Sequence, residues 1–173
     1  MGFNLVGVAL SERFIDKQAL CSLLGLGEVA LVDDHAIFEN ASSSYAMGDQ
    51  DIYITEVGNG TLITTAVYIN VADVGPVTEN GGKAMRFLLG DTTGLYNFFY
   101  AENGKGKRSF DIRESIIIDD RGQKLAVETQ GKDPSNVIFD LIEEITGMSF
   151  WSPLKEMFKF PAAIPVLPFS VPE

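Results

Sequence analysis

Apolar residues in the first half of the chain fall mostly in short runs or alternate with polar ones, which is typical of β-strands. Residues 3–10 are rich in apolar and β-branched side chains and predict a first strand. Residues 51–57 alternate, a Gly-Asn-Gly turn follows at 58–60, and a second β-rich run returns over 61–70. Glycine and asparagine between two such runs predict a hairpin.

Further along the chain, the same pattern predicts two more hairpins. In the first, residues 96–102 pair with 108–114 across a turn at 103–107, and in the second, residues 115–118 pair with 124–128 across 119–122. Two short strands, 29–32 and 36–38, are predicted on either side of a turn at Asp33-Asp34.

Two helices are indicated by capping residues as well as by periodicity. Asp16 precedes a helix over 17–24 that Gly25 ends, and Asp133 with Pro134 opens a second helix that Gly147 ends. In the second helix the apolar side chains recur at the spacing of a single face: Val137, Ile138, Leu141, Ile142 and Ile145.

Two shorter helical segments are also predicted. Residues 83–89 (KAMRFLL) favour one or two helical turns before Gly90, and Ser152-Pro153 opens a short helix that runs to Phe160. The last residues, 161–173, contain four of the seven prolines and cannot form a helix interior or a central strand.

These elements predict one α+β domain over residues 1–173, with a largely antiparallel sheet built from hairpins and helices packed on one face. The hairpins outnumber any possible βαβ units, which disfavours a doubly wound parallel sheet. Residues 161–173 are expected to form an extended, proline-rich C-terminal arm. We expect the arm to pack on the protein's own core, or alternatively on a partner or a second subunit. In the last case the protein would form a homo-oligomer through the arm.

The net charge of −11 is distributed unevenly along the chain, which adds a possible binding surface to the predicted fold. Residues 18–82 contain nine carboxylates and no Lys or Arg, whereas residues 83–173 contain thirteen acids and eleven bases. An acidic surface disfavours nucleic-acid binding. Three interpretations are open: a solvated face that aids solubility, a docking face for a basic protein partner, or a cation site.

The candidate catalytic chemistry is sparse. The single cysteine, Cys21, lies in the first predicted helix among apolar residues, and is expected to be a core residue. The single histidine, His35, lies in a predicted turn, so a Cys-His dyad stays open as an alternative. The chain has no Gly-x-Ser-x-Gly motif, and one cysteine with one histidine is too few for a structural zinc site.

Neither a metal nor a cofactor is predicted. The acidic pairs in turns do not match the twelve-residue calcium loop. Residues 25–30 (GLGEVA) match a relaxed dinucleotide fingerprint, but they follow a helix and open a strand, which is the reverse of the required order. We therefore expect a protein that is not an enzyme.

The sequence favours a cytoplasmic protein. It contains no run of about 18 consecutive apolar residues, so no membrane span is predicted. The N-terminal residues lack the basic region of a secretory signal, and a single cysteine fits a reducing compartment.

Residues 96–150 contain three patterns that together resemble a known class of protein. They are "FxYxENGKxxR" from residue 98, "IDDRGQKLAVE" from residue 118 and "IEEITGMSF" from residue 142. This layout resembles bacterial domains of the polymorphic-toxin immunity protein type. The resemblance covers about a third of the chain and implies a toxin-binding inhibitor, but it transfers no site residues.

The leading hypothesis is a cytoplasmic protein-binding module, an immunity-type inhibitor that docks on a basic toxin or enzyme through an acidic face. Its expected contact residues are Asp33, Asp34, Glu39, Asp49, Asp51 and Glu56. One alternative is a small hydrolase or lyase that uses a carboxylate pair in a pocket on the sheet. Another is a structural or self-associating module that uses the proline-rich arm.

Overall fold

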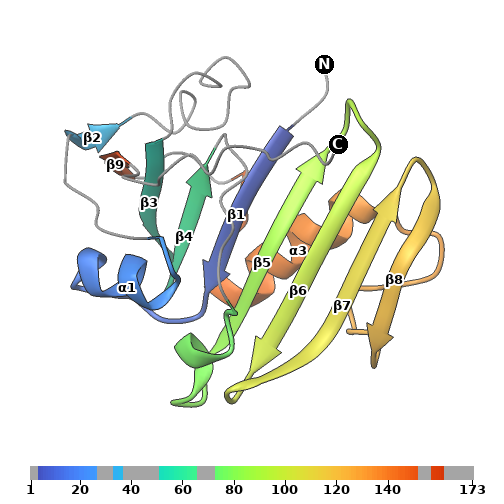
Figure 1. Ribbon diagram of the computed structural model, residues 1–173, viewed down its shortest axis with the longest axis horizontal. Helices are drawn as coiled ribbons and strands as arrows, with labels where there is room; N and C mark the ends of the chain where they lie inside the picture. The colour runs from blue at the N-terminus through green and yellow to red at the C-terminus, as the bar shows by residue number, and fades with distance from the viewer. Residues whose placement is uncertain (1–3, 27–32, 37–50, 66–72, 152–156, 162–173) are drawn as a thin grey trace, which may run out of the picture.

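The protein folds around one antiparallel sheet, as a computed structural model of the chain shows (Figure 1). The structure describes residues 4–26, 33–36, 51–65, 73–151 and 157–161. Within them, nine strands lie in the order β2-β9-β3-β4-β1-β5-β6-β7-β8. The strands are β1 (Asn4–Leu10), β2 (Asp33–Ala36), β3 (Asp51–Val57), β4 (Gly60–Thr65), β5 (Lys83–Gly90), β6 (Leu95–Glu102), β7 (Lys105–Arg113), β8 (Ile116–Gly122) and β9 (Met157–Pro161).

In the described part of the chain, two α-helices pack on this sheet, which confirms the α+β class with a largely antiparallel sheet. They are α1 (Lys17–Leu23) and α3 (Pro134–Thr146), and a short 3-10 helix covers Pro76–Thr78. Every strand pair in the described sheet is antiparallel. Tight hairpins join β3 to β4 and β5 through to β8, whereas β1 and β9 reach their neighbours by long-range pairing.

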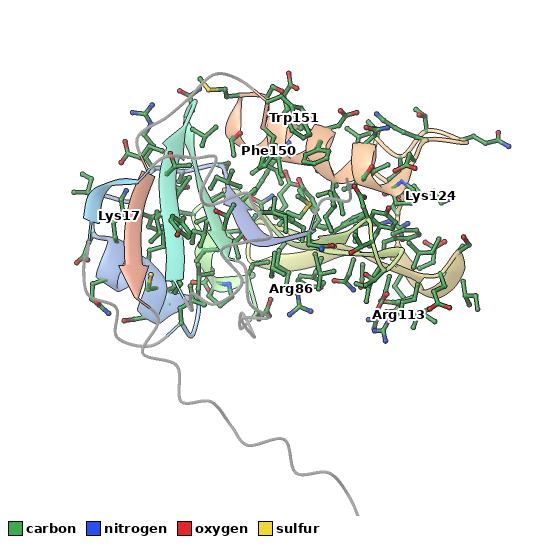
Figure 2. The ribbon with its side chains drawn as sticks, turned by 90° about the horizontal axis from the view of Figure 1, so that it is seen from above. Lys17, Arg86, Arg113, Lys124, Phe150 and Trp151 are labelled. Carbon is green, nitrogen blue, oxygen red and sulfur yellow. The ribbon has the colours of Figure 1, made fainter. Side chains whose placement is uncertain are left out.

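The two helices lie on opposite faces of the sheet, so the expectation that helices share one face is wrong (Figure 2). Successive side chains of a strand point to opposite faces, and β1 is apolar on both. Val8 and Leu10 pack with Leu20 and Leu24 in one cluster around α1. Leu5 and Ala9 belong to the other cluster, which contains the apolar face of α3.

Helix α3 follows its sequence signals closely. The Asp133 carboxylate accepts a hydrogen bond from the Ser135 backbone N–H at 2.9 Å, and the helix ends at Gly147, whose φ is 77°. All five predicted core residues are buried: Val137, Ile138, Leu141, Ile142 and Ile145. The hairpin between β6 and β7 is confirmed too, but its turn is shorter than the predicted 103–107. It has two residues, Asn103 and Gly104, both with positive φ as a type I′ turn requires, and β7 begins at Lys105.

Residues 83–89 form strand β5, not the predicted helical turns. Lys, Ala, Met and Leu favour helices locally, but β5 pairs with β1 on one side and with β6 on the other. Met85, Phe87 and Leu89 alternate along the strand and are buried under α3. Burial on a pleated surface therefore decides the conformation against local propensity.

The third predicted hairpin is also wrong. Strand β8 pairs with β7 across a turn at Glu114-Ser115, both with positive φ. Residues 124–128 do not form a strand, because the Glu128 carboxylate closes a turn by accepting a hydrogen bond from the Leu125 backbone N–H at 2.8 Å.

Two other segments pair as strands where the sequence predicted different elements. Asp33-Asp34 was expected to be a turn but begins β2, and residues 157–160 were expected to be helical but belong to β9. Strand β9 is inserted between β2 and β3 and gains backbone hydrogen bonds on both sides, which local sequence cannot reveal. The predicted strand at 29–32 and residues 162–173 of the predicted arm lie outside the described residues.

The cap of α3 provides a test of this helix. Asp133→Ala removes the acceptor of the Ser135 N–H, and we expect it to lower the free energy of unfolding by about 1 kcal/mol. Glu143→Ala, on the exposed face of the same helix, is the matched control and should change it by less than about 0.5 kcal/mol. Urea denaturation followed by circular dichroism measures both values. Equal effects would contradict the assigned cap.

Candidate functional site

A cleft of about 690 Å³ lies where the beginning of α3 and residues 124–132 approach strands β6, β7 and β8. Its floor is apolar and comes from the sheet face that carries α3: Tyr96, Phe98, Phe110, Ile112 and Ile117. Its walls are Pro134, Val137 and Ile138 of α3 and the chain from Glu128 to Lys132. Lys124 lies on this side of the molecule, whereas Arg86 and Arg113 extend from the other side of the sheet (Figure 2).

The register of the strands explains why these side chains form one floor. Tyr96 lies opposite Ile112, which lies opposite Ile117, so the three form a row across β6, β7 and β8. Phe98 and Phe110 begin the next row, and their ring centroids are 5.8 Å apart. Apolar cross-strand pairs of this kind stabilise a sheet and here leave an apolar surface under the cleft.

Arg108 is the polar centre beneath one end of the cleft. Its side chain is fully buried, and its guanidinium contacts the Glu128 carboxylate at 2.7 Å and Asp120 at 2.5 Å. It also donates to the backbone carbonyls of Ser109 and Arg121 at 3.2 and 3.0 Å. The hydrogen bonds with Glu128 raise the pKa of Arg108 above its usual value. This ion pair ties residues 124–128 to β7.

The Tyr96 hydroxyl is also held in place. It donates to the Asp91 carboxylate at 2.9 Å. Burial, the hydrogen bond to Asp91 and the charges of Asp91 and Asp133 raise the pKa of Tyr96 to about 12. The phenol is therefore neutral near pH 7 and serves as a floor residue with a fixed orientation.

The two residues considered for a Cys-His dyad are Cys21 and His35, and neither is among the described residues that line the cleft. Cys21 is completely buried on α1, as expected of a core cysteine, and burial raises the pKa of its thiol to about 11. A thiol of that pKa is a weak nucleophile near pH 7. His35 lies on β2 but its side chain is not described, and no group of three or more metal-binding side chains occurs in the described ranges.

The outer edge of β8 is a second notable feature. Ile116, Ile117 and Ile118 are 64%, 58% and 56% exposed, although they are consecutive apolar residues in a strand. Asp119 follows them, and its carboxylate contacts Arg121 at 2.7 Å and Ser109 at 2.5 Å, which lowers its pKa. Within the described sheet β8 is a terminal strand, so one row of its backbone groups faces away from the sheet.

The six acids predicted to contact a partner have different surroundings. Glu56 is paired with Lys17 at 3.0 Å and lies 3.7 Å from Arg13, so its charge is compensated. Asp33 and Asp34 are on β2 and Asp51 is on β3, and only β9 separates these two strands. Glu39 and Asp49 lie outside the described residues.

Strand β9 brings a basic residue into this end of the sheet. Lys159 is opposite Asp33 on one side and Tyr53 on the other in the backbone register. The fold therefore gathers Asp33, Asp34 and Asp51 but adds Lys159 beside them, which the base-free stretch in the sequence did not suggest.

Neither the cleft nor the β8 edge is predicted from the sequence. The run of three isoleucines before Asp119 was a usable signal, because β-branched residues next to charges are typical of a strand near solvent. The cleft had no such signal, since it depends on Glu128 reaching back to Arg108 across twenty residues.

No family model, curated protein or solved structure shows a significant match to the chain. None of the helices in the described part of the chain is long and apolar enough to cross a membrane.

The ion pair under the cleft gives a testable energetic prediction. Glu128→Ala leaves the buried Arg108 without its main partner, and we expect a loss of about 3 kcal/mol in the free energy of unfolding. The double variant Arg108→Met/Glu128→Leu removes both charges and should recover at least half of that loss. Chemical denaturation measures both, with Lys105→Gln at the exposed first residue of β7 as the control. A double variant no more stable than Glu128→Ala would contradict this account.

Proposed function

We propose that this chain is a protein-binding module that adds an extended strand of a basic partner protein to the edge of β8. The observation that carries the proposal is the exposure of three consecutive isoleucines, Ile116 to Ile118, on a terminal strand. Unpaired backbone N–H and C=O groups on such an edge can bind another strand, and exposed apolar side chains add contact area.

The edge differs from the protected edges of most sheets. Natural proteins commonly cover or charge an edge strand, which prevents unwanted pairing. Here the charged residues of β8 lie only in its second half: Asp119 pairs with Arg121 at 2.7 Å, and Asp120 pairs with Arg108. The first half presents only isoleucines. A partner strand with apolar residues opposite these isoleucines would cover them.

The basic character of the partner follows from charge. The net charge of −11 attracts a cationic protein and accelerates encounter. Asp33, Asp34 and Asp51 lie at the far end of the sheet from β8, so they can steer a partner without touching the bound strand. In this proposal β8 makes the specific contact with the partner, and the acids attract the partner over a longer distance.

Within this proposal, the resemblance of residues 96–150 to immunity proteins favours an inhibitor of a basic toxin or enzyme. The segment that carries the resemblance contains β7, β8 and α3, so it includes the proposed edge. A cytoplasmic location, where Cys21 stays reduced, fits the same role.

The edge can be tested with two matched double variants. Ile116→Lys/Ile118→Lys places charge on β8, whereas Ile15→Lys/Leu23→Lys alters two exposed apolar residues near α1. We expect the β8 variant to weaken binding of the partner at least tenfold and the control to leave it unchanged. Quantitative affinity capture from native lysate identifies the protein lost selectively, and titration with that purified protein gives the dissociation constants. A partner retained equally by both variants contradicts the proposal.

The acids are tested separately. Asp33→Asn/Asp34→Asn/Asp51→Asn should slow association severalfold and reduce its dependence on salt, while the dissociation rate stays nearly constant. Stopped-flow or surface plasmon resonance measurements at several ionic strengths separate the two rates. Unchanged association would mean that these acids serve only solubility.

A further inference from the structure

We propose that the cleft between α3 and strands β6 to β8 binds a small amphipathic carboxylate, with its apolar body on the sheet and its carboxylate at Lys124. This site shares Ile117 with the β8 edge and also includes Asp120 of β8, but the rest of its lining lies on β6, β7, α3 and residues 124–132, and it makes a further function available to the same domain. Its volume of about 690 Å³ lies within the range of about 300–1,000 Å³ that small-molecule sites occupy.

The apolar body of the ligand is specified by the floor and one wall. Phe98 and Phe110 lie next to each other across two strands, and Tyr96 and Ile112 continue the same surface. Val137 and Ile138 of α3 are buried in one cluster with Phe98 and close the inner side of the cleft. A chain or ring of carbon atoms on the half-buried side chains of Tyr96, Phe110 and Ile112 loses contact with water, which favours binding.

The charge of the ligand follows from the partners of the charged lining residues. Asp120 and Glu128 are both paired with Arg108, at 2.5 and 2.7 Å. Lys132 pairs with Asp140. Lys124, which also lines the cleft, has no ion pair within the described part of the chain. Asp120 and Glu128 share the one guanidinium of Arg108, so both carboxylates are already hydrogen-bonded. The ammonium of Lys124 is the charged lining group that has no such partner among the described residues, and it is the group placed to bind an anion.

The mouth of the cleft provides neutral hydrogen-bonding groups and room for entry. Thr129 and Gln130 line it beside Gly131. A Cβ atom built on Gly131 would meet no atom within 4 Å, so the chain there borders open space. A carboxylate near Lys124 can thus stay partly hydrated, while the hydroxyl of Thr129 and the amide of Gln130 lie along the same rim.

Three eight-carbon compounds test the ligand class on the full chain: octanoate, 1-octanol and octylammonium. Titration followed by backbone amide shifts in two-dimensional NMR reports both the site and the dissociation constant. We expect shifts at Lys124, Gly131 and Val137 and a three- to fivefold tighter affinity for octanoate than for octanol, as an exposed ion pair provides. Octylammonium should bind more weakly than both.

Substitutions locate the interaction. Lys124→Gln should abolish the preference for octanoate and leave octanol unchanged, whereas Lys107→Gln, an exposed residue near the start of β7, should alter neither. Thr129→Trp, which fills the mouth, should weaken all three compounds. Ile116→Lys/Ile118→Lys should keep octanoate binding, since neither residue lines the cleft.

Two results overturn the proposal. One is the absence of saturable shifts at the cleft amides with octanoate in the millimolar range. The other is a preference for octanoate that survives Lys124→Gln, which would place the carboxylate elsewhere. Thermal unfolding of each variant confirms that a lost response does not come from a lost fold.

Discussion

The β6–β8 side of the molecule depends on the ion pairs that the buried guanidinium of Arg108 forms. Helix α3 packs mainly on β5, β1, β4 and β6, so β7 and β8 extend beyond its cover. Arg108 compensates by binding Glu128 and Asp120, which fixes residues 124–128 over this part of the sheet. A fully buried charge is tolerated only when it is paired and hydrogen-bonded, and the two backbone carbonyls complete that requirement.

The position of the helices determines which surfaces remain for binding. Helix α1 covers the side of the sheet formed by β3, β4 and β1, and α3 covers the opposite face over the centre. Beyond the helices, the α1-side face of β7 and β8 carries Ser109 and Arg121 joined to Asp119, together with the exposed Ile116 opposite Arg113. Among the described residues at this end, the accessible apolar surface therefore includes the cleft and the isoleucines of β8.

Local sequence predicts an element well where the stabilising contacts are local. The Asp133 cap, the Gly147 stop and the apolar face between them all act within α3, so this helix was predicted correctly. Residues 83–89 and 124–128 were not, because their conformations depend on distant partners. Strand β5 lies between β1 and β6, and the turn at 125–128 exists because Glu128 binds Arg108, twenty residues earlier. Such contacts override helix or strand propensity.

The surroundings of a charged residue also depend on residues that are distant in the sequence. In the sequence, Glu56 lies in a segment that contains no Lys or Arg. In the structure, β3 pairs with β4 and β4 pairs with β1, and this brings Glu56 near the loop that follows β1. That loop carries Arg13, and Lys17 begins α1 directly after it. Strand β9 introduces Lys159 beside Asp33 in the same way. Because folding mixes charges from distant segments while a run of isoleucines stays together on its strand, the apolar edge is the more robust basis for a binding surface in this protein.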